Sequence, residues 1–329
     1  MASYVEPRIP QFADLPLQKS HPPYSAWGVW GEADQLGCLN HLTPDVVLNA
    51  AREIRTGKTV GLSWELNQMR IPPWYRIKLQ HKLISLADCI NDDEVHFNTQ
   101  SSSQWDGFRH WCFSDGRFYN GITQEEVRSG KSSRLGIHEW TKKGIVGRGV
   151  LIDYYAYAKE RGIQYDPWSF HKISLSTIRS IAEEKNIEFQ PGDILFLRTG
   201  YIKRYEATSD EDLERIMKSP ETRYPGMEGS VESLEWLWNS RFAAVAGDGP
   251  GFEAWCGGAG EVGESAGDEF YRMHETLLSG FGMPIGELFD LEELARLCSE
   301  HSRWTFFVTS QPLKVVGGVG SPPNAIAIF

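Results

Sequence analysis

The sequence is poor in the features that mark nucleic-acid-binding and membrane proteins. Its 33 Lys and Arg residues are outnumbered by 44 Asp and Glu residues, so the formal net charge is −11. No run of Lys or Arg could follow a phosphate backbone. No apolar stretch is long enough to cross a bilayer. Neither nucleic acid nor a membrane is therefore expected as a partner.

Cysteine pairs, a leader and nucleotide motifs are also missing. The five cysteines are scattered, without the spacing of a zinc ribbon or a disulfide scaffold, which favours reduced thiols in an intracellular protein. The first sixteen residues hold neither a basic patch nor an apolar run of signal-peptide length, so a cytoplasmic location is expected. No glycine-rich loop matches G-x-G-x-x-G or a P-loop, and we expect no nucleotide cofactor.

Aromatic residues, by contrast, are abundant. Twelve Trp, twelve Tyr and sixteen Phe exceed what a core strictly needs, so some rings are expected to line a cavity for a flat or apolar ligand, although core packing would also explain them. The composition, 41% hydrophobic and 23% charged, is that of a globular protein. Residues 1–26, rich in Pro and polar residues, are predicted to form an N-terminal arm, and residues 27–329 one domain.

The apolar pattern predicts a mixed α/β domain. Thr43 and Pro44 suit the start of a helix of about three turns that ends at Gly57, and a new helix is expected near Asp290. The other predictions are a strand in TVGLSWEL, buried strands at 146–152, 194–197 and in FAAVAG, and an amphipathic helix in ISLSTIRSIAEEKNI. Strands that alternate with helices indicate a single mixed β-sheet with flanking helices.

The densest polar cluster is QSSSQWDGFRHW, from Gln100 to Trp111. Within it, four polar side chains stand at even spacings and would share one face of an extended strand: Gln100, Gln104, Asp106 and His110. Burying such groups without partners is costly, whereas a pocket or a metal ion would satisfy them. An ordinary solvent-exposed strand face would explain the same spacing.

A second cluster lies in HETLLSGFGMPIGELFDLEELARLC. Its polar members are His274, Glu275 and Glu287. An imidazole with a carboxylate is a common pair for binding a divalent metal or for acid–base catalysis. Spacing alone is equally compatible with a surface glutamate and a hydrogen-bonded histidine, and it does not show that the two clusters meet.

QSSSQWDGFRH resembles the motif H-x-G-T-H-x-D-x-P-x-H of the cyclase family, which includes bacterial kynurenine formamidases and isatin hydrolases. Further segments resemble family blocks in the same order: WGEADQLGCLNHLTP, GIVGRGVLID, PGDILFLRTGY and HETLLSGFGMPIGELFDLEEL. SSQWDGFRH and GSPPNAIAIF are similar to fungal members. The resemblance implies the family's α/β fold of the swivelling β/β/α type, and it implies that the two polar clusters form one site.

The motif positions carry an important difference. Gln100 and Gln104 stand where the family's first two histidines are expected, Asp106 matches the aspartate, and His110 matches the histidine that is thought to shuttle protons. Glutamine offers an amide oxygen instead of an imidazole nitrogen and binds zinc poorly. The resemblance therefore implies that the first metal position of the family is lost.

A second metal position is implied by the remaining ligands. By position, His274 and Glu287 resemble the later histidine and glutamate that hold the second ion together with the motif aspartate, here Asp106. These three residues could hold one divalent ion, Zn or Mn.

Other residues are expected to bind an aromatic small-molecule substrate. The candidates are Gln100, Gln104, Trp105 and Arg109, with Trp27 and Trp30 covering the pocket. Family members are usually homo-oligomers, so a homo-oligomer is expected, and the two N-terminal tryptophans could belong to a neighbouring subunit. Core packing explains these two rings nearly as well.

Three functions remain open at this point. The first is a metal-assisted enzyme that hydrolyses or closes an amide, lactam or ester, with His110 and Asp106 as catalytic residues. The second is a metal-independent cyclase, isomerase or dehydratase of secondary metabolism that positions a polyketide-like or aromatic intermediate by hydrogen bonds. The third is a ligand-binding protein without activity on the same scaffold.

Overall fold

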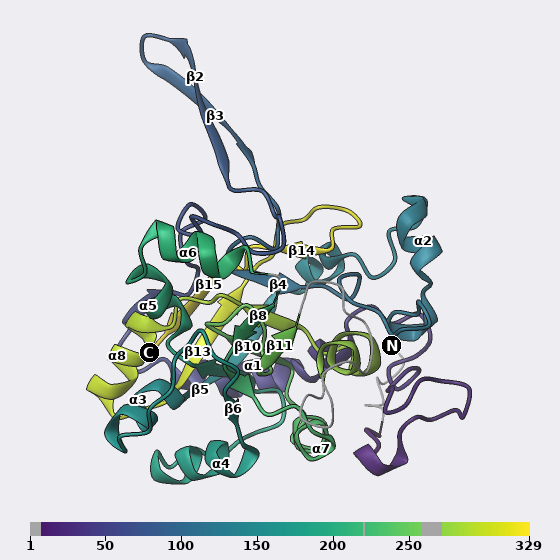
Figure 1. Ribbon diagram of the computed structural model, residues 1–329. Helices are drawn as coiled ribbons and strands as arrows, with labels where there is room; N and C mark the ends of the chain where they lie inside the picture. The colour runs from purple at the N-terminus through teal and green to yellow at the C-terminus, as the bar shows by residue number, and fades with distance from the viewer. Residues whose placement is uncertain (1–7, 220, 258–271) are drawn as a thin grey trace.

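The computed structural model describes residues 8–219, 221–257 and 272–329 (Figure 1). At its centre is a nine-stranded mixed sheet, in which four neighbouring strands are parallel and the outer ones antiparallel. In spatial order the strands are β1 (Thr59–Gly61), β15 (Ala325–Ile328), β13 (Thr305–Ser310), β5 (Ile145–Asp153), β7 (Ile194–Arg198), β10 (Ala244–Gly247), β12 (Ile285–Glu287), β4 (Gln104–Asp106) and β14 (Gly320–Ser321). This confirms the predicted single mixed sheet.

The parallel strands at the centre are almost continuous apolar runs. Every residue of β7 and β10 is buried, as is β5 from Gly149 onward. Strands covered on both faces need apolar side chains on both, which explains why these segments lack polar alternation. The three strands predicted at 146–152, 194–197 and within FAAVAG are confirmed.

Helices surround the sheet. They are α1 (Pro44–Ala50), α2 (Gln124–Ser129), α3 (Tyr154–Glu160), α4 (Leu175–Glu184), α5 (Tyr201–Glu206), α6 (Asp210–Met217), α7 (Val231–Asn239) and α8 (Glu292–His301), a π-helix at Thr276–Phe281, and 3₁₀ turns at Phe12–Asp14, Gly37–His41, Ala51–Glu53, Tyr119–Gly121 and Ile137–Lys142. The amphipathic α4 is confirmed within the predicted segment. No helix in the described ranges is long and apolar enough to cross a membrane.

Some predicted boundaries differ from the structure. The Thr43 side chain accepts a hydrogen bond from the Val46 amide, as an N-cap does, but α-helical geometry ends at Ala50 and continues only as a 3₁₀ turn. Of TVGLSWEL, only Thr59–Gly61 is a strand. This strand, β1, lies at the edge of the sheet and pairs with the short strand β15 over these three residues alone. Of the predicted arm, residues 1–7 lie outside the described residues, while Phe12 is buried and its amide donates to Asn239.

Three two-stranded sheets lie outside the main one. They pair β8 (Thr222–Tyr224) with β11 (Trp255–Gly257), β6 (Lys172–Ile173) with β9 (Gly226–Met227), and β2 (Gln80–Ala87) with β3 (Ile90–His96). The β2–β3 hairpin projects from the body of the molecule (Figure 1). The β8–β11 pair belongs to a second, smaller apolar cluster that includes Tyr224 and Trp255.

Candidate metal and active site

The site begins where β4 and β12 pair at one end of the main sheet. Gln104 lies directly opposite Glu287 in the antiparallel register, so their side chains share a face. The Gln104 amide Nε2 donates to Glu287 Oε2 at 2.5 Å. Because side chains alternate along a strand, Asp106 lies on the same face as Gln104, and Asp106 is fully buried. The short strand β4 therefore brings the two sequence clusters together.

The other two members of the polar motif reach the same place by turns. The segment from Gln100 to His110 is not one extended strand, as the even spacing predicted, because only Gln104–Asp106 has strand geometry. Gln100 precedes a bend, and its Nε2 donates to Asp106 Oδ1 at 2.5 Å. His110 follows a turn closed by its amide and the Gly107 carbonyl, which leaves its Nε2 3.8 Å from Asp106 Oδ2.

His274 completes the cluster just before the π-helix. Its Nε2 lies 3.1 Å from Glu287 Oε1 and 3.7 Å from Asp106 Oδ2. Burial opposes a charged ring, but the negative charge of Glu253, with hydrogen bonds to the surrounding carboxylates, raises the pKa of His274 well above its usual value. His274 therefore lies among three carboxylates, one of which, Asp106, comes from a distant segment of the chain.

Glu253 is a site residue that sequence reasoning missed. Its Oε1 accepts hydrogen bonds from the backbone amides of Met273 and His274 at 3.1 Å each, and its Oε2 lies 2.8 Å from His274 Nδ1. This carboxylate fixes the ring so that Nε2 points at Asp106 and Glu287. Glu253 lies between Phe252 and Ala254 in a buried segment, and a carboxylate inside an apolar run was the one signal that could have found it.

Asp106, His274 and Glu287 each offer a ligand atom, and these atoms lie within 4.8 Å of one another. Burial and the neighbouring charge of Asp106 raise the pKa of Glu287 to about 8. Asp106 Oδ2 and Gln104 Oε1 are buried, and neither has a hydrogen-bond partner among the described residues. Buried polar atoms normally have partners, so two orphaned oxygens beside a surplus of carboxylates fit a cation that binds there. The donor set, two carboxylates and one imidazole, is suited to a divalent transition metal.

His110 differs from His274 in its electrostatic surroundings. Burial lowers the pKa of His110. The charge of Asp106 raises this pKa, but the positive charges of Arg76 and His274 lower it further, and the net shift is downward. At neutral pH the ring is thus neutral and can accept or donate a proton. Arg76 is a second residue that sequence reasoning missed. Its Nη1 donates to the Gln100 carbonyl at 2.8 Å, and its charge acts on Asp106 and Glu287.

Aromatic rings border His274. Trp111 lies with its ring centre 5.4 Å from that of His274, and Trp255 lies at 6.3 Å. The Trp255 ring in turn stacks on Tyr224, which is fully buried. These three rings offer flat apolar surface next to the polar cluster.

Four predicted substrate-binding residues have other places in the structure. Trp105 points to the opposite face of β4, where its Nε1 donates to Ser310, because neighbouring strand residues alternate in direction. The Arg109 guanidinium donates to the backbone carbonyls of Val127, Ser132 and Gly317. Trp27 donates to the Ser279 carbonyl, and Trp30 packs against Trp238 in the core. In the structure these side chains support loops and the core, and their role in binding a substrate stays a prediction.

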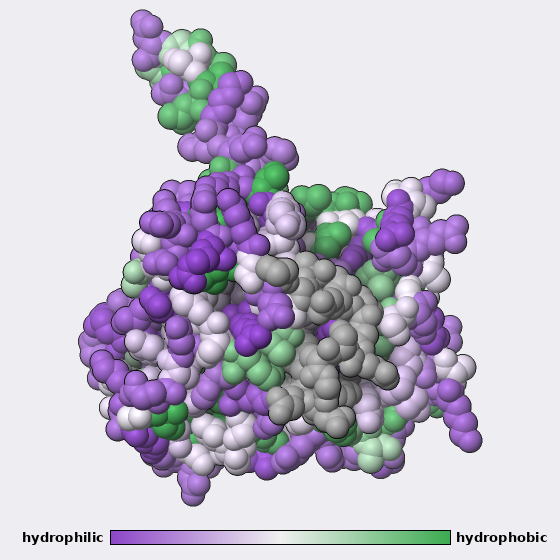
Figure 2. Space-filling view, viewed as in Figure 1, coloured by the Kyte–Doolittle hydropathy of each residue, from purple (hydrophilic) through white to green (hydrophobic). Residues whose placement is uncertain are grey.

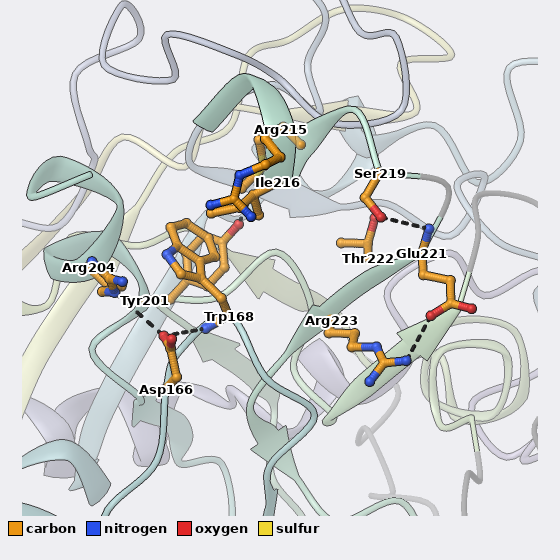
Figure 3. A pocket seen from close by; sticks show the side chains of 11 residues that line it. Asp166, Trp168, Tyr201, Arg204, Arg215, Ile216, Ser219, Glu221, Thr222 and Arg223 are labelled. Carbon is orange, nitrogen blue, oxygen red and sulfur yellow. Dashed lines mark hydrogen bonds and ion pairs between the residues drawn. The ribbon is translucent and has the colours of Figure 1, made fainter. Parts of the chain in front are cut away.

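A separate cavity of about 490 Å³ lies beside α5 and α6 (Figure 3). Trp168 and Tyr201 form one wall, and three arginines line it: Arg204, Arg215 and Arg223. In the figure, dashed contacts join Arg204 to Asp166 and Arg223 to Glu221. None of the residues of the polar cluster lines this cavity. Because its arginines already have carboxylate partners, it shows no surplus charge of the kind found around His274.

Known protein families and solved structures include relatives of this chain. The Cyclase family model matches residues 41–254, which is more than half of the chain. The crystal structure of a novel cyclase is 28% identical, with a TM-score of 0.80 over 93% of this chain and 99% of that chain. Isatin hydrolase A from Labrenzia aggregata, bound to benzyl benzoate, is 17% identical, with a TM-score of 0.58 over 88% of this chain and 98% of that one. No curated protein matches the chain.

Proposed function

The chain belongs to the cyclase family, and from this premise we propose that it is an enzyme that hydrolyses, or closes in the reverse direction, an amide, lactam or ester bond of an aromatic small molecule. The observation that carries the proposal is the buried surplus of carboxylates around His274, with two orphaned oxygens at its centre. The similarity in fold to an isatin hydrolase, a hydrolase by name, supports the reaction class.

Asp106, His274 and Glu287 would hold one divalent ion, Zn or Mn. Such an ion, when bound, polarises a carbonyl oxygen and lowers the pKa of water. Gln100 and Gln104 occupy the positions of the motif's leading histidines, so a second ion lacks its nitrogen ligands. Their amide groups instead hold the carboxylates of Asp106 and Glu287 in place through the hydrogen bonds described above.

His110 is the residue placed to move protons. Its neutral ring can accept a proton from the attacking water at Nε2 and pass it to the leaving nitrogen or oxygen of the substrate. Trp111, which is only partly buried, would hold the flat part of the substrate beside His274, and Trp255, which contacts Trp111 and stacks on Tyr224, would support it. Hydrolysis of an amide or ester releases a carboxylate, and Arg76, whose charge acts on Asp106 and Glu287, would attract it.

Elemental analysis of the purified protein, paired with turnover before and after a chelator, tests this proposal. We expect about one ion per chain, loss of turnover of aromatic lactams or esters on chelation, and recovery when Zn or Mn is added back. Full turnover by metal-free protein would rule out the metal-assisted reaction.

A metal-independent reaction is the second candidate, and one observation favours it. Both glutamine side chains donate N–H groups to the carboxylates that would otherwise bind the ion, so part of the negative charge is already satisfied by hydrogen bonds. In that case Gln100, Gln104 and His110 would position an aromatic or polyketide-like intermediate for cyclisation, isomerisation or dehydration.

The variant Gln104→Ala separates the two candidates when it is measured in metal-free protein. The metal-independent reaction predicts a loss of about 10²-fold in kcat, because a preorganised donor is removed. Unchanged turnover contradicts that candidate. Absence of any turnover, together with tight binding of an aromatic ligand, would instead indicate a ligand-binding protein on this scaffold.

A further inference from the structure

Tyr224, in the strand β8, carries a buried hydroxyl group that makes no hydrogen bond with any described residue. The residue is 2% exposed. Burial, followed by the negative charges of Glu287 and Glu253, raises the pKa of Tyr224 well above its usual value, so the phenol keeps its proton at neutral pH. A buried tyrosine normally finds a hydrogen-bond partner. This hydroxyl is therefore an unused donor beside the carboxylates that surround His274.

Two neighbours fix the place of the hydroxyl. Trp255 stands directly opposite Tyr224 on β11, and the two rings stack with 6.3 Å between their centres and 11° between their planes. At the far end of the ring, a Cβ at Gly251 would lie 2.4 Å from the hydroxyl oxygen. Gly251 has no left-handed backbone angle, so the close approach of the tyrosine is what favours glycine there. Gly251 comes two residues before Glu253, which places the hydroxyl next to the segment that holds His274.

Arg76 brings further unused donors to the same place. Its Nη1 donates to the Gln100 carbonyl at 2.8 Å, and its guanidinium lies 4.6 Å from the centre of the Trp74 ring. It makes no ion pair with any described carboxylate, although its charge acts on Glu287 and on Tyr224. An arginine side chain offers several N–H donors in a planar fork, so those that do not contact Gln100 can bind an oxygen atom of a ligand.

The loop that carries Arg76 has a strained backbone. Trp74 and Tyr75 both have a φ of 57°, in the left-handed region that residues with side chains rarely adopt. Strain of this kind persists where the surrounding structure holds it, and it is common at sites that bind ligands. The chain continues from this loop into the β2–β3 hairpin, which rises from the body of the molecule in Figure 2. Arg76 nevertheless contacts Gln100 within the body, so the strained loop keeps its side chain at the cluster.

The rest of the cluster offers mainly acceptors. Gln104 directs its amide N–H groups to Glu287 and Gln100, and Gln100 directs its own to Asp106. Ionised carboxylates accept hydrogen bonds and donate none. When water attacks a carbonyl group, negative charge develops on the carbonyl oxygen, and donors that already point to this oxygen stabilise it most. Tyr224 and Arg76 supply donors of this kind.

We propose that the Tyr224 hydroxyl and the Arg76 guanidinium are catalytic donors that hold the carbonyl oxygen of the substrate and stabilise the negative charge that develops on it. This role presupposes the hydrolysis proposed above. The water oxygen bonds to the carbonyl carbon, the C=O electron pair moves to the oxygen held by the two donors, and His110 Nε2 takes the proton of the water. When the C=O bond forms again, the C–N or C–O bond breaks and His110 passes the proton to the leaving group.

Single substitutions test the two donors with phenyl acetate, acetanilide or 2-oxindole, whichever the wild-type chain turns over fastest. Tyr224→Phe and Arg76→Gln should each lower kcat by about 10²-fold, because each removes a preorganised donor. KM should stay near its wild-type value, since the charge that these donors stabilise appears only in the transition state. Arg76→Lys keeps the positive charge and should recover part of the lost kcat.

Stability and matched variants separate this role from a structural one. Tyr224→Phe removes a hydroxyl without a partner in the described chain, so the midpoint of urea denaturation should not fall. Tyr201→Phe is the control for a buried tyrosine, because its hydroxyl lies in the same apolar cluster but points to Met217 Sδ at 4.0 Å. Arg223→Gln is the control for an arginine, because Arg223 is exposed and pairs with Glu221. Both controls should keep the wild-type kcat.

Loss of kcat in both donor variants, at unchanged KM and stability, supports the proposed role. The role is overturned if kcat stays within about twofold of wild type in either variant, or if Tyr224→Phe lowers stability along with kcat. Either result leaves the hydrolysis intact, because the wild-type chain still turns over the probe. A wild-type chain that turns over none of the three probes would instead count against the hydrolysis and against this role together.

Discussion

Two buried charge clusters in this molecule contain similar side chains but are arranged in opposite ways. At the end of β7, Arg198 makes hydrogen bonds of 2.8 to 3.0 Å with both oxygens of Asp153 and both of Glu292. Around His274, three carboxylates share one imidazole, and Asp106 Oδ2 accepts no hydrogen bond from any described residue.

The difference indicates which cluster stabilises the fold and which one binds a ligand. A buried charge whose every group is paired holds segments together, whereas a buried surplus of one sign is costly to the fold and persists where something binds. The Arg198 cluster joins β7 to the starts of α3 and α8 and needs no ligand. The His274 cluster lies at the junction of β4 and β12, and its surplus is what a metal ion or a substrate would satisfy.

The largest effect is expected from a substitution that breaks the Arg198 cluster, in which every charged group is paired. Arg198→Met keeps most of the side-chain volume but leaves Asp153 buried and unpaired, so the free energy of unfolding should fall by about 3–5 kcal/mol. Urea denaturation measures it. The matched control is Arg296→Met on α8, whose ion pairs with Glu293 and Glu300 are exposed to solvent, so its loss of stability should be far smaller than that of Arg198→Met. Equal losses for both variants would show that burial does not set the value of these pairs.

The next largest effect is expected from a substitution that weakens the His274 cluster without removing any of the three candidate metal ligands. Glu253→Gln keeps the size of the side chain but weakens its hold on His274 Nδ1, so the affinity for Zn should fall by about 10–100-fold. Calorimetric titration of the chelator-treated protein measures this directly, whatever the turnover. Glu235→Gln, an exposed change on α7, serves as the control. Unchanged affinity in Glu253→Gln would mean that the imidazole is positioned by other contacts.

Much of the scaffold could be predicted from the sequence, because β5, β7 and β10 are apolar runs of strand length and local pattern suffices for them. The meeting of Asp106 with His274 and Glu287 could not be derived from spacing, since it depends on the pairing of β4 with β12, and only resemblance implied it. The direction of the Trp105 side chain, which donates to Ser310, could not be predicted either, because it depends on which residues of β4 have strand geometry. Glu253 and Arg76 were missed because each enters the cluster from a segment without a polar pattern.

The smallest expected effect has the opposite sign. In the metal-free protein, burial and the charge of Asp106 raise the pKa of Glu287 to about 8, so folding at neutral pH requires this carboxyl to take up a proton. Glu287→Gln removes that cost and should raise the free energy of unfolding by about 0.5–2 kcal/mol at pH 7, while Zn binding is lost. Urea denaturation in the presence of a chelator measures the first effect and calorimetry the second. Glu292→Gln, the same change in the satisfied cluster, should instead destabilise the fold, because Arg198 loses a charged partner. A loss of stability in both variants would show that the carboxylates around His274 are structural, as those around Arg198 are.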